Sequence, residues 1–204
     1  MNTRMIICLV VSFVVLSACT PVASAEPAAP TEAPIATDEP KNSEYYPLST
    51  RTGIADVDVV ITAVESGDVQ ALRDLVRFTT IGCTKAEGIG GPPKCGEGEA
   101  EGTLVNVLPL LGPEGSFIYE SDLSSFNPMK ALGIYAVYSV SKSAYSEEAY
   151  PAGKYAVMFA TEEDQIFVIY QIRDGIVRMD TVFSPTSRDT IIQRDASELI
   201  LEPK

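Results

Sequence analysis

The stretch KYAVMFATEEDQIFVIYQIRDGIVRMDTVFS, residues 154–184, decides the fold of this chain. Its runs of β-branched and aromatic residues are typical of strands, and a similar run precedes them. We expect four strands, at residues 134–141, 154–160, 165–173 and 176–184. A polar turn at 161–164 and the hairpin dipeptide Asp174-Gly175 join the last three strands into an antiparallel sheet.

The Asp174-Gly175 loop also fixes how the last two strands pair. The expected pairs are Arg173 with Ile176, Gln171 with Arg178, and Ile169 with Asp180, and the preceding turn sets Ala160 opposite Gln165. One face of the sheet then collects a dense apolar set: Tyr155, Val157, Phe159, Ile166, Val168, Tyr170, Ile172, Val177, Met179, Thr181 and Phe183. We interpret this face as the core face.

The opposite face is half apolar and half polar, and it supplies the residues of a candidate pocket: Met158, Phe167, Gln171, Arg178 and Asp180. Two interpretations fit this face, the lining of a semi-polar pocket and a solvent-washed surface with scattered apolar residues. Arg178 and Asp180 share the face because they lie two residues apart on one strand. A surface ion pair is the plainer reading of the two, because a carboxylate beside a guanidinium stays ionised and makes a poor general acid.

Two helices precede the sheet, so the fold class is α+β. Apolar residues recur at helical spacing in residues 56–65, and Gly67 and Asp68 are suited to end this helix and begin the next. The second helix is expected at residues 69–78. Residues 104–111 fit either a strand or a buried segment, and residues 123–129 predict a helical turn.

Residues 79–102 contain seven Gly and two Pro and predict a long loop. Cys83 and Cys95 are the only cysteines after residue 44, so in an oxidising compartment we expect a disulfide between them. Two free thiols or a metal pair are the alternatives, although the chain has no His and no CxxC motif, and we expect no metal and no cofactor. Glu97, Glu99 and Glu101 suggest calcium less strongly than a solvated acidic loop.

The first 44 residues predict a secretion signal followed by a tether. Residues 5–16 form an apolar segment that follows Arg4 and is too short to span a bilayer. The next residues, Leu16-Ser17-Ala18-Cys19, resemble the bacterial lipobox. The resemblance implies cleavage before Cys19 and attachment of diacylglycerol and further fatty-acyl chains, such as palmitate, to that cysteine.

The chain is therefore expected to divide into a lipoprotein signal peptide (1–18), an acylated Cys19 with a disordered Pro/Ala-rich tether (19–44), and a folded domain (45–204). The expected location is the extracytoplasmic face of a cell membrane, held by the lipid and not by a transmembrane helix. Two alternatives remain open: ordinary secretory cleavage after Ala25, at an A-x-A site, and incidental cysteines at positions 8 and 19.

Composition excludes several classes of function. Without His the chain has no Ser-His-Asp triad and no HExxH zinc site. Its net charge of −13, with 13 bases against 23 acids in residues 45–204, argues against a nucleic-acid partner. The expected partners are the membrane, through the N-terminal lipid, and an unknown small molecule or protein.

The segments VITAVESGDVQALRDLV (60–76) and QIRDGIVRMDTVF (171–183) resemble the NTF2-like superfamily, in particular its SnoaL-like members. The resemblance covers mainly residues 54–78 and 154–184 and implies a helix pair packed on a curved antiparallel sheet, forming a cone with an internal pocket. Catalytic members commonly use Asp, His or Tyr inside the cone. Here Asp180 and the sheet tyrosines are available but no motif marks them, so no catalytic residue is assigned.

Three hypotheses about function follow. The favoured one is a tethered, non-catalytic domain that binds a small ligand or a partner at the cell surface. The others are a lyase, isomerase or hydrolase that uses an Asp or Tyr in the cone, and an accessory domain with a filled interior. The interior of the domain separates them. An enclosed pocket with a desolvated carboxylate and a nearby Tyr or Lys favours the enzyme, an apolar pocket without ionisable groups favours a binder, and a solid core favours the accessory domain.

Overall fold

The computed structural model describes residues 44–112, 115–163 and 165–204. The expected signal peptide (1–18), the lipid attachment residue Cys19 and the tether as far as residue 43 lie outside the described residues. Within the described part of the chain, no helix is both long enough and apolar enough to cross a membrane.

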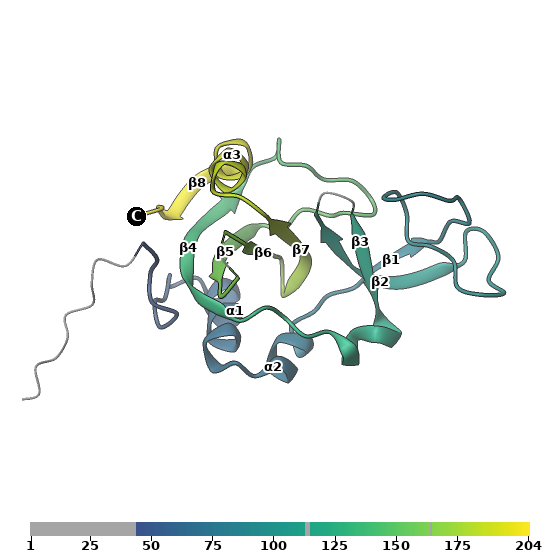
Figure 1. Ribbon diagram of the computed structural model, residues 1–204, viewed down its shortest axis with the longest axis horizontal. Helices are drawn as coiled ribbons and strands as arrows, with labels where there is room; N and C mark the ends of the chain where they lie inside the picture. Colours follow the sequence, from purple (N-terminus) through teal and green to yellow (C-terminus); the bar gives the residue numbers. More distant parts are fainter. Residues whose placement is uncertain (1–43, 113–114, 164) are drawn as a thin grey trace, which may run out of the picture. The chain divides into compact units, whose positions relative to one another are not determined.

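The fold is α+β and is built on one mixed sheet of eight strands (Figure 1). The strands are β1 (Thr79–Gly82), β2 (Leu104–Leu111), β3 (Ser116–Tyr119), β4 (Ala131–Val140), β5 (Tyr155–Thr161), β6 (Phe167–Ile172), β7 (Ile176–Val182) and β8 (Ala196–Leu201). Their order is β1-β2-β7-β6-β5-β4-β8, with β3 also paired to β2. Neighbouring strands of this sheet are antiparallel except β2 with β7, so the expectation of a wholly antiparallel sheet is wrong. Tight turns dictate antiparallel pairing only between consecutive strands, and β2 and β7 are far apart in the chain.

The four strands expected from the sequence are present as β4 to β7. Residues 104–111 form a strand, and Pro109 is tolerated where β2 changes its neighbour from β1 to β7. The long loop begins later than expected, because residues 79–82 form β1 and pair with β2. The helical turn lies slightly earlier than expected, as the 3-10 helix η1 (Glu120–Ser125).

Strand pairing follows the expected register in most places. Gln171 pairs with Arg178, and Ile169 pairs with Asp180. Arg173 does not pair with Ile176, because a bulge brings Ile172 opposite Ile176. Ala160 pairs with Phe167 and not with Gln165, a shift of two residues that keeps each side chain on its expected face. Phe183 is an error in the predicted core: it follows the end of β7 and is 54% exposed.

The two predicted helices are α1 (Ala55–Ser66) and α2 (Val69–Asp74). Gly67 ends α1 with a φ of 66°, and the Asp68 side chain accepts hydrogen bonds from the first turn of α2, as the sequence predicted. The second helix stops four residues earlier than expected. Leu75 and Arg77 instead make backbone hydrogen bonds to Ile176 at the start of β7, and these replace the helical bonds.

One apolar cluster joins α1 and α2 to the core face of the sheet. Val57, Val60 and Ile61 of α1 are fully buried in it, together with β5 and β6 residues that the sequence placed on the core face. The two helices lie on the same side of the sheet in Figure 1, below β5 and β6 in that view. This cluster is the main core.

A second core lies on the opposite face, which the sequence described as half polar. Helix α3 (Pro185–Asp195) contributes Ile191 and Ile192 to it. The Arg188 guanidinium lies 4.0 Å from the centre of the Tyr135 ring, and the Tyr135 hydroxyl donates to Asp189 over 2.7 Å. The solvent-washed interpretation of this face is therefore wrong, since α3 and the β4–β5 connection cover it.

A buried polar network also lies on this face. Arg178 is fully buried, and its Nε and Nη2 donate to the two carboxylate oxygens of Asp180 at 2.8 and 3.1 Å. Its Nη1 donates to the carbonyls of Tyr145 and Tyr150 in the connection between β4 and β5. The expected surface ion pair is thus a buried one, because residues 141–154 fold over it.

Close to the first described residue, the backbone of Tyr46 pairs with β4. Tyr46 and Ile134 exchange two backbone hydrogen bonds of 2.8 and 2.9 Å. The Tyr46 hydroxyl donates to the carbonyl of Glu202 near the C-terminus. A side chain at Gly133 would meet the Tyr46 carbonyl at 2.8 Å, so this close approach requires glycine.

Replacing Arg178 with Met should lower the free energy of unfolding by about 3–5 kcal/mol, because Asp180 and two carbonyls lose their buried partner. Arg173→Met, an exposed Arg in the same hairpin, should change it by less than about 0.5 kcal/mol. Urea denaturation monitored by circular dichroism measures both. An Arg178 variant as stable as the Arg173 variant would contradict a structural role for the buried pair.

Candidate functional site

A cavity of about 480 Å³ lies between the corner of α1 and α2 and the core face of the sheet. We call it the corner cavity. Its walls come from residues 64–67, Val69 and Leu72 of the helix corner, from Leu48 and from residues 128–131, and its floor comes from β5 and β6. This volume is within the range of small-molecule sites, about 300–1,000 Å³.

The floor of the corner cavity is apolar and rigidly held. Phe159 of β5 and Val168 of β6 pair across the sheet, and Tyr170 is the next β6 residue on the same face. All three line the cavity while exposing 4% or less of their surface. Regular strand alternation therefore places three large side chains side by side beneath the helix corner.

Charges lie at the rim of the corner cavity and are paired there. Glu65 forms an ion pair with Arg51. Lys130 pairs with Glu162 and is 75% exposed. Among the described lining residues, Glu65, Lys130 and Tyr170 are the ones with an ionisable side chain. The interior therefore lacks a charge that could neutralise a buried ionic group.

The Tyr170 side chain is the polar feature of the floor. Its ring packs edge-on against Phe159, with 5.7 Å between ring centres. Burial raises the pKa of its phenol, so the hydroxyl stays protonated at neutral pH. No hydrogen bond joins this hydroxyl to any described residue. Thr161, the other hydroxyl on the floor, donates to backbone carbonyls of its own turn.

The structure does not gather the five predicted pocket residues around one cavity. They all lie on the face opposite to the corner cavity: Met158 and Phe167 are packed into the second core, and Gln171 and Arg178 are enclosed in the polar network. Asp180 borders a shallow hollow of about 320 Å³, which it shares with Tyr145 and Asp195.

Both carboxylates at that hollow are engaged by arginines. Burial raises the pKa of Asp180, and the Arg178 guanidinium opposes the rise. Asp195 accepts hydrogen bonds of 2.6 and 2.8 Å from Arg194. Gln171 completes the network by donating to Asp180 and by accepting from the backbone N–H of Gly153. The arrangement holds chain segments together and presents no free carboxylate paired with a nucleophile.

The sequence missed the corner cavity because nothing in a pattern of residue types reports an empty volume. The signals that were available are the apolar alternation of Val168 and Tyr170 and the helix break at Gly67. These place the walls correctly but also fit a filled core. Only the distance between helix corner and sheet distinguishes the two cases.

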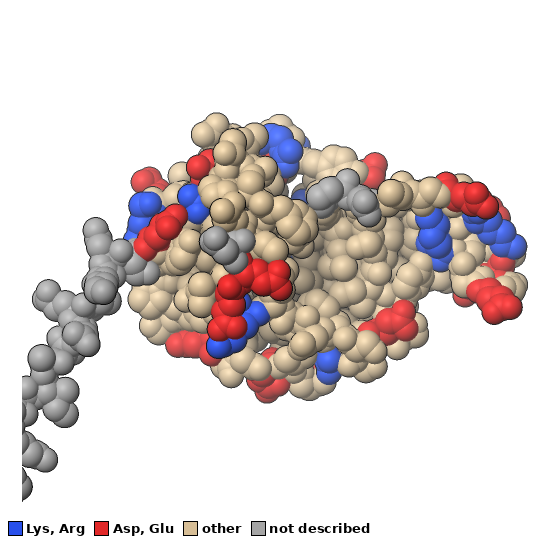
Figure 2. Space-filling view, viewed as in Figure 1, with Lys and Arg blue, Asp and Glu red and all other residues tan. Residues whose placement is uncertain are grey.

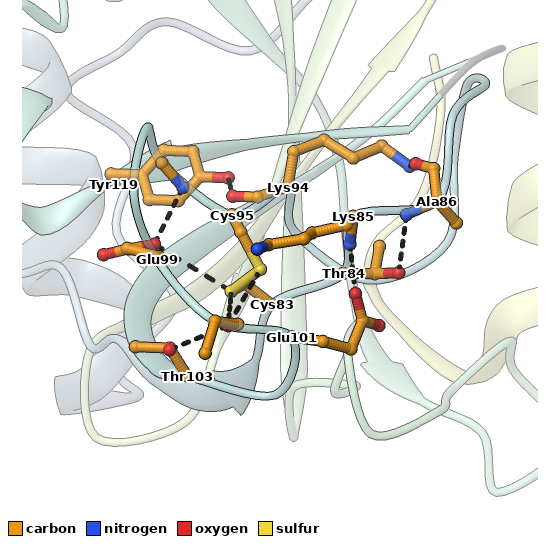
Figure 3. The surroundings of a disulfide bond; sticks show 12 residues. Cys83, Thr84, Lys85, Ala86, Lys94, Cys95, Glu99, Glu101, Thr103 and Tyr119 are labelled. Carbon is orange, nitrogen blue, oxygen red and sulfur yellow. Dashed lines mark hydrogen bonds between the residues drawn. A yellow bond between two sulfur atoms is a disulfide. The ribbon is translucent and has the colours of Figure 1, made fainter.

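Cys83 and Cys95 form the expected disulfide, with an S–S distance of 2.03 Å (Figure 3). Backbone hydrogen bonds from Gly102 to Cys83 and from Cys95 to Thr84 hold the loop around it. Figure 2 shows basic and acidic side chains close together over the loop beyond β1 and β2. No single-sign patch covers this end of the face shown.

Two of the loop glutamates accept hydrogen bonds from backbone groups of the same loop. Glu99 accepts from the N–H of Gly96 at 2.7 Å, and Glu101 accepts from the N–H of Lys85. Donor atoms of Cys83, Cys95 and Glu99 lie within 4.8 Å of one another, but a disulfide sulfur is not a thiolate ligand. The intact loop therefore offers neither calcium nor zinc a ready set of free ligands.

The cysteines of this loop should resist alkylation until a reductant is added, and the peptide mass of residues 83–95 should then rise by two alkyl groups. Replacing both with Ser should lower the free energy of unfolding by about 3 kcal/mol, since the unfolded chain loses its loop closure. Mass mapping and urea denaturation test the two statements. Alkylation of the native chain at either position would contradict the bond.

Comparison with protein-family models, with curated proteins and with solved structures found no match to this chain. The corner cavity, the paired charges at its rim and the enclosed polar network are therefore the features from which a function has to be inferred.

Proposed function

We propose that this chain is a lipid-anchored extracytoplasmic protein whose domain binds a small, largely apolar ligand in the corner cavity. The observation that carries the proposal is the apolar floor of that cavity, formed by Phe159, Val168 and Tyr170, without an ionised group inside. Cavities of this size and character are typical of small-molecule sites.

This proposal explains the interior better than the two alternatives. An enzyme needs an acid, a base or a nucleophile facing open space. Asp180 and Asp195 are each held by an arginine, and burial raises the pKa of Tyr170 so that its phenol stays a neutral donor. A purely structural domain needs a filled interior, whereas an open volume lies beside the main core. A binder needs only a shaped apolar site with few polar groups.

We also propose that the domain is an NTF2-like cone with its pocket between helices and sheet. The motifs at 60–76 and 171–183 support this, as does a cavity between the helix corner and the sheet. Bulges in β4 favour curvature, because extra residues bend a strand. The parallel pairing of β2 with β7 and the disulfide loop are additions to that pattern.

Filling the corner cavity should weaken the binding of a neutral apolar probe, N-phenyl-1-naphthylamine, whose fluorescence rises in apolar sites. Ala131→Trp places an indole at the wall and should weaken the probe at least about tenfold. The matched control is Leu132→Trp, at the next residue, which is 56% exposed and does not line the cavity.

The control should bind within about twofold of the native chain, and circular dichroism should show that both variants fold. Equal binding by the two Trp variants would place the probe elsewhere on the molecule. No binding by the native chain would remove the support for a binder.

The anchor is tested at the cysteine that the lipobox marks. Cys19→Ser should move the protein from the membrane fraction to the soluble fraction, because the acyl chains are lost. Cys8→Ser, in the segment expected to be removed, should leave it in the membrane. Intact mass should show a native chain that begins at residue 19 with added acyl mass. A native chain that begins at Glu26 without acyl mass would contradict the anchor.

A further inference from the structure

Tyr170 is held firmly where the corner cavity meets the sheet. It lies within β6, paired with Val157 on one side and with Met179 on the other. It is 3% exposed, and its ring is fixed against Phe159. Both its backbone and its ring are therefore positioned before any ligand arrives.

Tyr170 stands out among the described tyrosines because the residue lines the corner cavity and its hydroxyl makes no hydrogen bond to a described residue. The hydroxyls of Tyr46 and Tyr119 donate to backbone carbonyls, and that of Tyr135 donates to Asp189. Tyr138 and Tyr150 have buried hydroxyls without a partner, but neither lines the corner cavity. The Tyr170 hydroxyl is not among these fully enclosed atoms, so it keeps some accessible surface and is able to donate to an atom of a bound ligand.

The charge of the site limits what that ligand atom can be. Because burial raises the pKa of Tyr170, the phenol remains a neutral donor. Lys130 is the one Lys or Arg among the described lining residues, and it lies at the rim with Glu162 as its partner. A carboxylate or phosphate at the floor would lose its hydration without gaining an opposite charge, which is strongly unfavourable. A neutral oxygen acceptor carries no such penalty.

We propose that the ligand is an uncharged, largely apolar molecule with a carbonyl-type oxygen at its buried end, and that this oxygen accepts a hydrogen bond from the Tyr170 hydroxyl. Ketones, aldehydes and esters belong to this class. The inference rests on the proposed function, because it names the ligand class of the same cavity.

Three ligands of one shape test the inference by competition against N-phenyl-1-naphthylamine: phenylcyclohexane, 4-phenylcyclohexanone and 4-phenylcyclohexane-1-carboxylate. The native chain should bind the ketone about tenfold more tightly than the hydrocarbon, and the carboxylate most weakly. In Tyr170→Phe the preference for the ketone should vanish, while the affinity for the hydrocarbon stays within about twofold.

Tyr155→Phe is the matched control, because Tyr155 lies on the neighbouring strand and does not line the cavity. It should keep the preference for the ketone.

The melting temperature of Tyr170→Phe should equal or exceed that of the native chain, since the change removes a hydroxyl without a protein partner.

Two kinds of failure are distinguishable. Equal competition by ketone and hydrocarbon in the native chain, tightest binding of the carboxylate, or an unchanged ketone preference in Tyr170→Phe would overturn the ligand class while leaving an apolar site in place. If neither the probe nor any of the three ligands binds the native chain, the proposed function fails and the ligand class fails with it.

Discussion

The buried ion pair between Arg178 and Asp180 is the constraint that holds the β4–β5 connection over the sheet. The guanidinium of Arg178 uses its donors on a neighbouring carboxylate and on two carbonyls of the β4–β5 connection. It thereby fastens an irregular segment over β6 and β7, where backbone polar groups need internal partners. A buried ion pair is costly to form, but once the connection covers it, removing either partner is costlier still.

The contacts on this face of the sheet also fix the position of the residues on its other face. Tyr170 and Gln171 are neighbours in β6, and strand alternation sends their side chains to opposite sides. Gln171 bonds to Asp180 and to the backbone of Gly153, so the strand cannot slide. The corner cavity therefore has a floor that is rigid because of contacts made behind it. Such separation lets one strand serve structure on one face and a ligand on the other.

Local signals in the sequence predicted the parts of the fold that local physics determines. Gly67 and Asp68 mark helix ends through backbone geometry and capping bonds, and Asp174-Gly175 marks a hairpin through its positive φ angles. Helix α3 escaped notice because Ile191 and Ile192 are its only large apolar residues, too few for a helical stripe. It is held by Arg188 stacked on Tyr135, a contact between residues 53 positions apart that no periodicity reveals.

The same reasoning explains the outcome at the candidate site. The sequence identified Arg178 and Asp180 as a polar set on one face, and it could not show that residues 141–154 fold over them. It also assigned Tyr170 to the core face, which is where it lies. Whether a core face is filled or hollow depends on how far the helices stand off, and this is a property of the whole packing arrangement.

The contacts that hold Tyr46 against the sheet have a mechanical consequence. Tyr46 is fastened to β4 by two backbone hydrogen bonds and to the C-terminal segment by its hydroxyl, and Lys204 lies over its ring. A force applied through the residues before Glu44 would load the ion pair of Glu44 with Arg188 and then these contacts, and would peel residues 44–46 from β4. Leu48, which lines the corner cavity, comes two residues later, so tension on the chain would reach the wall of the cavity before it reached the central strands.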